Sequence, residues 1–346
     1  MKHLLFYFKY KTKFYTSPAL WEFFSKFLKR TSTKKYSQQF MSFGTLNPTV
    51  TFFVIRRRPP GWGFFSNVLY VLQGIIYAQE KNYIPIVDME NYWMSEIHSL
   101  KKINGTNNAW CYLFNQVSNF SLQEVYSSKN VVLSDAHNIL SRSHWLTLNP
   151  PTIFESRTLL EDAGKIISKY VKLNEVAELH DSDVKEKLLW NPKKILGVFV
   201  RGTGYYDFIP SAATQLPSFD HLVSEITDTL LQNELSSLYI STEDYRVYLR
   251  LCQAFEKYSI IPSIKFQEGL TIESWLSTQK LTYDNGVQMG YQNSLKYVTE
   301  IMLLSECENL VVTPSNASAF ALARSNLAIG DHRVLMKNRV IKVQNL

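Results

Sequence analysis

The sequence predicts an α/β protein with two consecutive domains, each formed by a parallel sheet and covering helices. The chain has 346 residues, of which 45% are hydrophobic and 19% charged, and this length favours two domains over one. Short apolar runs alternate with helical patterns in two separate sets. Many of these runs are apolar throughout, as in strands that a parallel sheet buries on both faces.

The first set of elements predicts an N-terminal domain over residues 48–190. A β-rich run at Val50–Ile55 is followed by a helical pattern at Phe64–Gln79 and by a short strand at Tyr83–Val87. Another strand is expected at Val131–Leu133. The order strand, turn, helix, strand is that of a parallel βαβ unit.

The second set predicts a C-terminal domain over residues 191–346, and two Rossmann-like domains are the simplest architecture. We place the boundary at Asn191-Pro192. Its expected strands and helices are, in chain order, Ile195–Val200, Phe219–Leu231, Ser237–Ile240, Tyr245–Tyr258, Ser263–Phe266, Leu295–Ser305, Asn309–Val312 and Ser318–Ala323.

The composition argues against several classes of protein. The three cysteines, Cys111, Cys252 and Cys307, are far apart, which indicates neither a disulfide framework nor a structural metal site. We therefore expect a reducing, cytoplasmic location, and no metal or other cofactor. No apolar run reaches the ~20 residues of a membrane-spanning helix.

The basic residues are concentrated in an N-terminal arm, residues 1–47. Residues 1–60 hold twelve Lys or Arg and one acid, a local charge of +11, so the rest of the chain is acidic although the net charge is +7. This distribution argues against a nucleic-acid partner. From Ser17 to Arg30 the spacing predicts an amphipathic basic helix, which either packs on its own domain or binds an anionic inner membrane surface through residues 1–45.

Polar residues follow four of the expected strands, where open α/β sheets bind their ligands. Arg201 follows an apolar strand and enters a glycine-containing loop, where its guanidinium suits either a diphosphate or a salt bridge at a domain edge. Thr313-Pro314-Ser315-Asn316 leads from a strand into a helix and suits either phosphate binding or N-capping. The turn at residues 61–67 has two glycines and precedes a helix, and Asp88 follows the next strand.

Together and in this order, the motifs resemble the fucosyltransferase superfamily of α-1,6-fucosyltransferases, nodulation fucosyltransferases and protein O-fucosyltransferases, over roughly residues 50–330. Residues 197–205 resemble its His-x-Arg-Arg-x-Asp motif, residues 239–244 its Thr-Asp-Asp motif, and residues 293–318 its third motif. The resemblance implies a GT-B-like fold with two Rossmann-like domains facing each other across a cleft. It also implies that Arg201 holds the β-phosphate of GDP, that Glu300 accepts the guanine N–H groups and that Ser315 with Asn316 completes the phosphate cradle.

The chain departs from the family pattern around Arg201: Phe199, Gly202 and Gly204 stand where the family has His, Arg and Asp. We name Asp207 as the substitute for the missing general base, so the expected catalytic residues are Arg201 and Asp207. The expected nucleotide-sugar contacts are Phe199, Arg201, Gly202, Thr203, Glu300, Thr313, Ser315 and Asn316. The expected contacts to the acceptor, or around it, are Gly63, Ser66, Asn67, Asp88, Glu243 and Asp244.

The resulting hypothesis is a glycosyltransferase that moves a sugar, with GDP-fucose favoured as the donor, to a glycan or glycoconjugate without a metal. Two alternatives remain open. One is a transferase of the same fold with a different nucleotide-sugar, since the departures lie where donor contacts are expected. The other is a catalytically silent relative that binds a nucleotide or a glycan.

Overall fold

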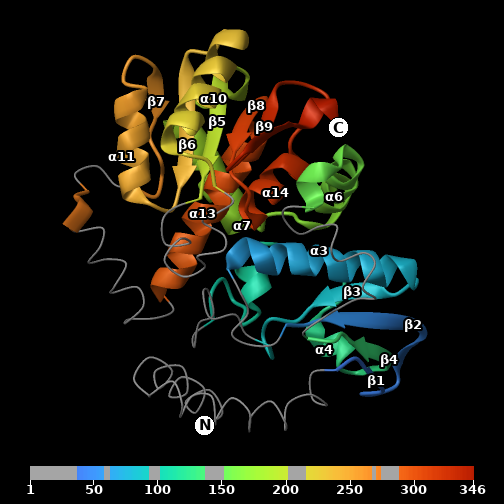
Figure 1. Ribbon diagram of the computed structural model, residues 1–346. Coiled ribbons are helices and arrows are strands. Elements are labelled where there is room, and N and C mark those ends of the chain that lie inside the picture. Colours follow the sequence, from blue (N-terminus) through green and yellow to red (C-terminus); the bar gives the residue numbers. More distant parts are fainter. Residues whose placement is uncertain are drawn as a thin grey trace, which may run out of the picture.

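The computed structural model describes residues 37–57, 63–92, 102–136, 152–201, 216–266, 270–273 and 288–346. The expected helix from Ser17 to Arg30 lies outside these ranges. The described chain forms two α/β units, one above the other in Figure 1, each with its own sheet. Within these ranges, no helix has the length and apolar character needed to cross a bilayer.

The N-terminal sheet has the strand order β1-β4-β2-β3. Its central strand β2 is parallel to both β3 and β4, while the edge strand β1 is antiparallel to β4. Helix α3 packs on β2 and β3, and the short helix α4 packs beside β4. These elements are β1 (Gln39–Met41), β2 (Leu46–Ile55), α3 (Phe64–Glu80), β3 (Ile84–Val87), α4 (Leu122–Val125) and β4 (Ser128–Leu133).

The C-terminal sheet has six strands in the order β10-β9-β8-β5-β6-β7, all parallel except the edge strand β10. Every residue of β5 is buried, because α10 and α11 cover one face of the sheet and α13 and α14 the other. Its elements are β5 (Ile195–Val200), α10 (Phe219–Gln232), β6 (Ser237–Thr242), α11 (Tyr245–Ala254), β7 (Ser259–Ile261), α13 (Gln288–Glu306), β8 (Asn309–Val312), α14 (Asn316–Arg324), β9 (His332–Met336) and β10 (Arg339–Lys342).

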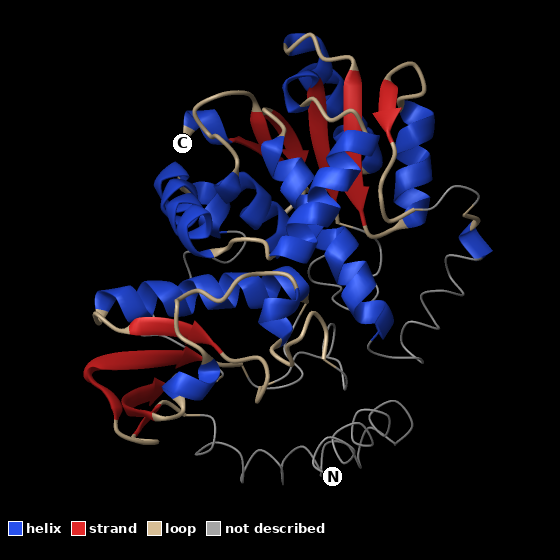
Figure 2. Ribbon diagram, turned by 180° about the vertical axis from the view of Figure 1, so that it is seen from behind, coloured by secondary structure: helices blue, strands red, loops and turns tan. Residues whose placement is uncertain are grey.

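Two helices, which come after the last strand of the N-terminal sheet and before the first strand of the C-terminal sheet, contact the C-terminal unit. Helix α6 (Arg157–Tyr170) packs on α14, and α7 (Glu175–Lys187) packs on α13. A Cβ atom at Gly164 of α6 would lie 2.1 Å from the carbonyl oxygen of Ala323 in α14. Only glycine permits this approach of the two backbones. Figure 2 shows α3 and the helices packed on it between the two sheets, whereas α10 and α11 lie on the other face of the C-terminal sheet.

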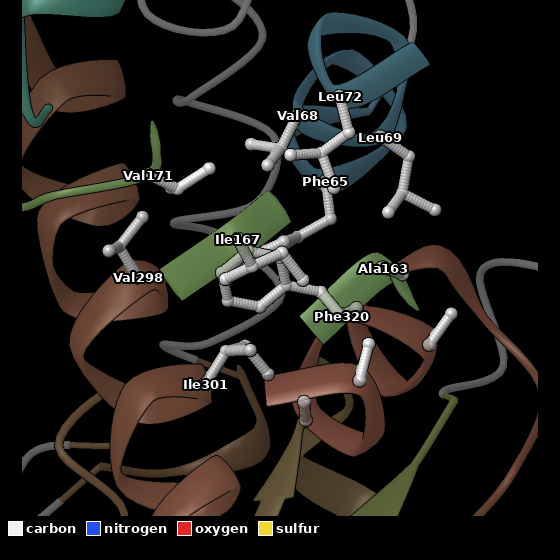
Figure 3. Packing of buried hydrophobic residues seen from close by; sticks show 14 of the residues in the cluster. Phe65, Val68, Leu69, Leu72, Ala163, Ile167, Val171, Val298, Ile301 and Phe320 are labelled. Carbon is white, nitrogen blue, oxygen red and sulfur yellow. The ribbon is translucent and has the colours of Figure 1, made fainter. Parts of the chain in front are cut away.

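A single hydrophobic core joins the two units. Helix α3 turns Phe65, Leu69 and Leu72 toward α6 and α14, as Figure 3 shows. The Phe65 ring lies 5.0 Å from that of Phe320 in α14 and 5.1 Å from that of Tyr297 in α13. Helix α3 therefore packs on its own sheet and on the neighbouring unit at once.

The predicted α/β class with two Rossmann-like, parallel-rich sheets is confirmed. The expected strand at Ser263–Phe266 is wrong: β7 ends at Ile261, and Ser263 and Lys265 instead bind a buried carboxylate described below. Residues 39–41, assigned to the arm, form β1 because their backbone pairs with β4. The strands β9 and β10 were not predicted.

Candidate functional site

Arg201 lies at the topological switch point of the C-terminal sheet. Strand β5 is followed along the chain by β6 on one side, while β8, on its other side, comes much later. The Arg201 backbone N–H donates to Thr313 Oγ1 at 2.8 Å, which joins the ends of β5 and β8. Open α/β sheets bind their ligands outside such a point.

The guanidinium of Arg201 is partly exposed and paired with an acid. Its Nε lies 3.1 Å from Oε1 of Glu243, which follows β6, and the two side chains are 30% and 41% exposed. The pair places one cation and one carboxylate at neighbouring strand ends. An incoming diphosphate would compete with Glu243 for the same guanidinium.

Ser315 begins α14 as its N-cap. Its Oγ accepts from the Ser318 N–H at 3.0 Å, while Ser318 Oγ accepts from the Ser315 N–H at 2.9 Å and lies 2.7 Å from the carbonyl oxygen of Thr313. Ser315 is 7% exposed and Asn316, the first helical residue, is half-buried. The N-capping interpretation of this motif is therefore present in the structure, and phosphate binding by Ser315 and Asn316 stays a prediction.

Glu300 of α13 is fully buried against β6 and the segment that follows β7. Oε2 accepts from Ser241 Oγ at 3.2 Å and lies 2.7 Å from Lys265 Nζ. Oε1 accepts from Ser263 Oγ and, at 3.2 Å, from the Lys265 N–H. Because all these donors belong to the protein, a guanine contact by Glu300 stays a prediction that requires the carboxylate to exchange a partner.

Phe199 and Asp244 have structural partners. Phe199 is 0% exposed in the hydrophobic core, so its ring is not available for a base to stack on. Asp244 is the N-cap of α11 and binds Arg246, with Nε at 3.0 Å from Oδ1 and Nη2 at 2.8 Å from Oδ2. The remaining expected residues of this loop, Gly202, Thr203 and Asp207, lie outside the described ranges.

At the N-terminal sheet, two of the residues expected near the acceptor are bound by an arginine that was not predicted from the sequence as a site residue. Arg57 follows β2, and its Nη1 donates to the Ser66 carbonyl at 3.0 Å and to Asn67 Oδ1 at 2.9 Å. Its guanidinium lies 4.6 Å from the ring centre of Tyr70. Burial lowers the pKa of Arg57 to about 10, which leaves it charged near neutral pH.

Arg56 and Asp88 hold the fold at the same edge of this sheet. Arg56 is 2% exposed, and its Nε donates to the Ser134 carbonyl at 2.8 Å, which ties β2 to β4. Asp88 is 0% exposed and accepts from the Asn91 N–H at 2.9 Å and from the Tyr126 hydroxyl at 2.6 Å. Gly63, the N-cap of α3, is exposed.

The structure thus brings Arg201, Thr313 and Glu243 together in one unit and Arg57, Ser66 and Asn67 in the other. The triplet Arg56 to Arg58 just after an apolar strand is the signal that could have identified Arg57. Across the described ranges, no cluster of three or more His, Cys, Asp or Glu side chains is arranged to hold a metal ion.

Comparison of the sequence with protein-family profiles and with curated proteins finds no match. Solved structures similar to this chain include the NodZ α-1,6-fucosyltransferase soaked with GDP-fucose, at 14% identity and a TM-score of 0.48 over 85% of this chain and 98% of that one. A mutant of Arabidopsis thaliana FUT1 in complex with GDP has 13% identity and a TM-score of 0.45 over 85% and 72% of the two chains.

A third similar structure is POFUT1 in complex with GDP-fucose, at 9% identity and a TM-score of 0.41 over 81% of this chain and 95% of that one. These three solved structures are thus all of fucosyltransferases. With identities this low and TM-scores below 0.5, we base the function on the residues of this chain.

Proposed function

We propose that this chain is a glycosyltransferase of the GT-B type, which transfers a sugar from a GDP-sugar, with GDP-fucose favoured, to a glycan or glycoconjugate hydroxyl. The observation that supports it most is the junction of Arg201 and Thr313 at the switch point of the C-terminal sheet. A partly exposed guanidinium there suits a diphosphate, to which it can donate two parallel hydrogen bonds.

In the proposed reaction, the acceptor oxygen attacks the anomeric carbon and the bond from that carbon to the β-phosphate oxygen breaks. The electron pair leaves with GDP, and Arg201 stabilises the charge that develops on the phosphate. The acceptor proton passes to a carboxylate. Asp207 is the proposed base, and Glu243, held beside Arg201, is the alternative.

A titration with GDP, UDP, ADP and CDP tests the proposed donor. We expect GDP to bind most tightly, and at 100 times its Kd it should raise the free energy of unfolding by about 2.7 kcal/mol. Calorimetry measures the affinities, and denaturant unfolding measures the stabilisation. Equal binding of all four nucleotides, or binding of none, contradicts the proposal.

A different nucleotide-sugar is the second candidate. The observation that favours it is the buried network in which Ser241, Ser263 and Lys265 already engage Glu300. Tighter binding of UDP, ADP or CDP than of GDP in the same titration would select this candidate. GDP binding without any sugar transfer or donor hydrolysis would select a catalytically silent relative.

We also propose that the N-terminal arm attaches the enzyme to the cytoplasmic face of an anionic membrane. Beyond its charge, the support is a group of exposed apolar side chains on and beside β1, where the arm enters the sheet. The exposed fractions are 72% for Phe40, 39% for Met41, 39% for Phe43 and 50% for Leu46.

Deleting residues 1–36 is expected to abolish co-sedimentation with vesicles that contain phosphatidylserine, because each Lys or Arg near such a surface contributes about 1 kcal/mol. The deletion ends before β1, so the pairing of β1 with β4 is kept. Vesicles of phosphatidylcholine alone serve as the control. Unchanged sedimentation of the shortened chain would show that the arm has another role.

A further inference from the structure

The N-terminal sheet has its own switch point, and Arg57 lies beside it. Strand β2 continues through α3 to β3 on one side, whereas β4 on its other side comes much later in the chain. The hydroxyl of Tyr70 lies 3.0 Å from the Arg56 carbonyl oxygen and 2.9 Å from that of Asp135, so it links the ends of β2 and β4. Arg57 lies against the ring of this tyrosine.

The guanidinium of Arg57 is fixed in place by neutral partners. Both hydrogen bonds that it makes within the described ranges use Nη1, and both acceptors, the Ser66 carbonyl and Asn67 Oδ1, are uncharged. Among the ion pairs of these same ranges, none involves Arg57. The positive charge is therefore held in position and not balanced by a carboxylate of this part of the protein.

The other edge of the guanidinium, Nε with Nη2, can bind both oxygens of one carboxylate. Arg246 of this same protein shows the geometry, since its Nε and Nη2 bind the two oxygens of Asp244 at 3.0 and 2.8 Å. Neither Nε nor Nη2 of Arg57 is among the fully buried polar atoms without a partner in the described chain. Since the hydrogen bonds found for this guanidinium within these ranges both use Nη1, the Nε and Nη2 edge of the half-buried side chain keeps some area open to solvent.

We propose that Arg57 binds the carboxylate of an acidic sugar in the acceptor glycan, such as a uronic acid, through Nε and Nη2. The contact would make Arg57 a residue that selects the acceptor, because a charge-assisted bidentate bond is available to a uronate and not to a neutral sugar. That the acidic glycan is an acceptor rests on the proposed function. The binding of an acidic glycan is testable without any transfer.

The test compares a hyaluronan tetrasaccharide, which contains glucuronate, with a neutral tetrasaccharide of N-acetylglucosamine. Calorimetry on the full chain is expected to show at least about tenfold tighter binding of the acidic probe. Arg57→Gln keeps a donor for the Ser66 carbonyl but removes the charge, and it should reduce the preference to less than about threefold. Arg57→Lys should retain part of the preference, because it keeps the charge without the bidentate edge.

Arg250→Gln is the matched control, because it removes an equal charge from the guanidinium that lies 3.8 Å from the ring centre of Phe219 in the other unit. This variant should keep the full preference. Raising the salt concentration should reduce the preference in the wild-type chain, as screening requires. A wild-type chain without preference, or an Arg57→Gln variant that keeps it, overturns the proposal.

A GDP titration on the same samples separates this inference from the proposed function. Arg57→Gln should leave the GDP affinity unchanged, because Arg57 and Arg201 belong to different sheets. If GDP fails to bind while the acidic preference depends on Arg57, the transferase proposal fails and the glycan site stands. If Arg57→Gln weakens GDP and leaves the acidic preference intact, Arg57 belongs to the donor site instead.

Discussion

Replacing Arg201 by alanine is expected to lower the affinity for GDP by about 100-fold or more and to abolish sugar transfer. Two charge-assisted hydrogen bonds to a phosphate contribute about 1.5–3 kcal/mol each, and each 1.4 kcal/mol is a factor of ten in affinity. The side chain is 30% exposed and its ion pair with Glu243 is near the surface, so the midpoint of thermal unfolding should change little. Calorimetry with GDP and a product assay measure the two losses.

Glu243→Gln is the matched control for this prediction. It removes the carboxylate that lies 3.1 Å from Arg201 Nε, and with it the group that competes with a diphosphate for the guanidinium. GDP affinity should stay the same or increase in this variant. Normal GDP affinity in Arg201→Ala would remove Arg201 from the donor site.

Replacing Lys265 by methionine is expected to lower the free energy of unfolding by about 3–5 kcal/mol, the usual cost of leaving one partner of a buried ion pair alone. The reason is Glu300, whose side chain is 0% exposed while that of Lys265 is 17% exposed. The ammonium also lies 4.2 Å from the ring centre of Tyr297. Urea unfolding of the full chain measures the change.

Adding Glu300→Gln to the methionine variant should restore a large part of the lost stability, because the uncompensated charge is then absent. Lys165→Met is the control: its pair with Asp162 on α6 has 74% and 59% exposed side chains, and its loss should be too small to measure. A stability loss in Lys265→Met that Glu300→Gln does not reduce would show that packing, and not charge, is responsible.

The strands that the sequence predicts best are those buried on both faces. Residues 195–200 and 309–312 form β5 and β8 with the expected bounds, because a short run of apolar residues between polar breaks leaves few alternatives. Strand β9, by contrast, includes His332 and Arg333. Its burial depends on ion pairs of Arg333 with Asp331 and Glu225, and Glu225 is far away in sequence.

The candidate site was predictable only in part, for a similar reason. The position of Arg201 follows from strand and turn patterns, and in the structure it comes directly after β5, beside Thr313. The donors that bind the Glu300 carboxylate come from β6 and from the segment after β7. No local sequence pattern predicts that these segments contact Glu300. Arg57 lies in a basic triplet, and the different partners of Arg56 and Arg57 become visible only once β2, β4 and α3 are packed.

Helix α3 also fixes the geometry in which two substrates would meet. Since it packs on β2 and β3 below and on α6 and α14 above, it acts as a spacer between the two sheets. Swinging the sheets apart at this edge would expose Phe65 and Phe320 to water, at roughly 1.5–3 kcal/mol for each side chain. We therefore expect the distance from Arg57 to Arg201 to be fixed by the fold. This distance would set the separation, along the acceptor, between the acidic sugar and the hydroxyl that is modified.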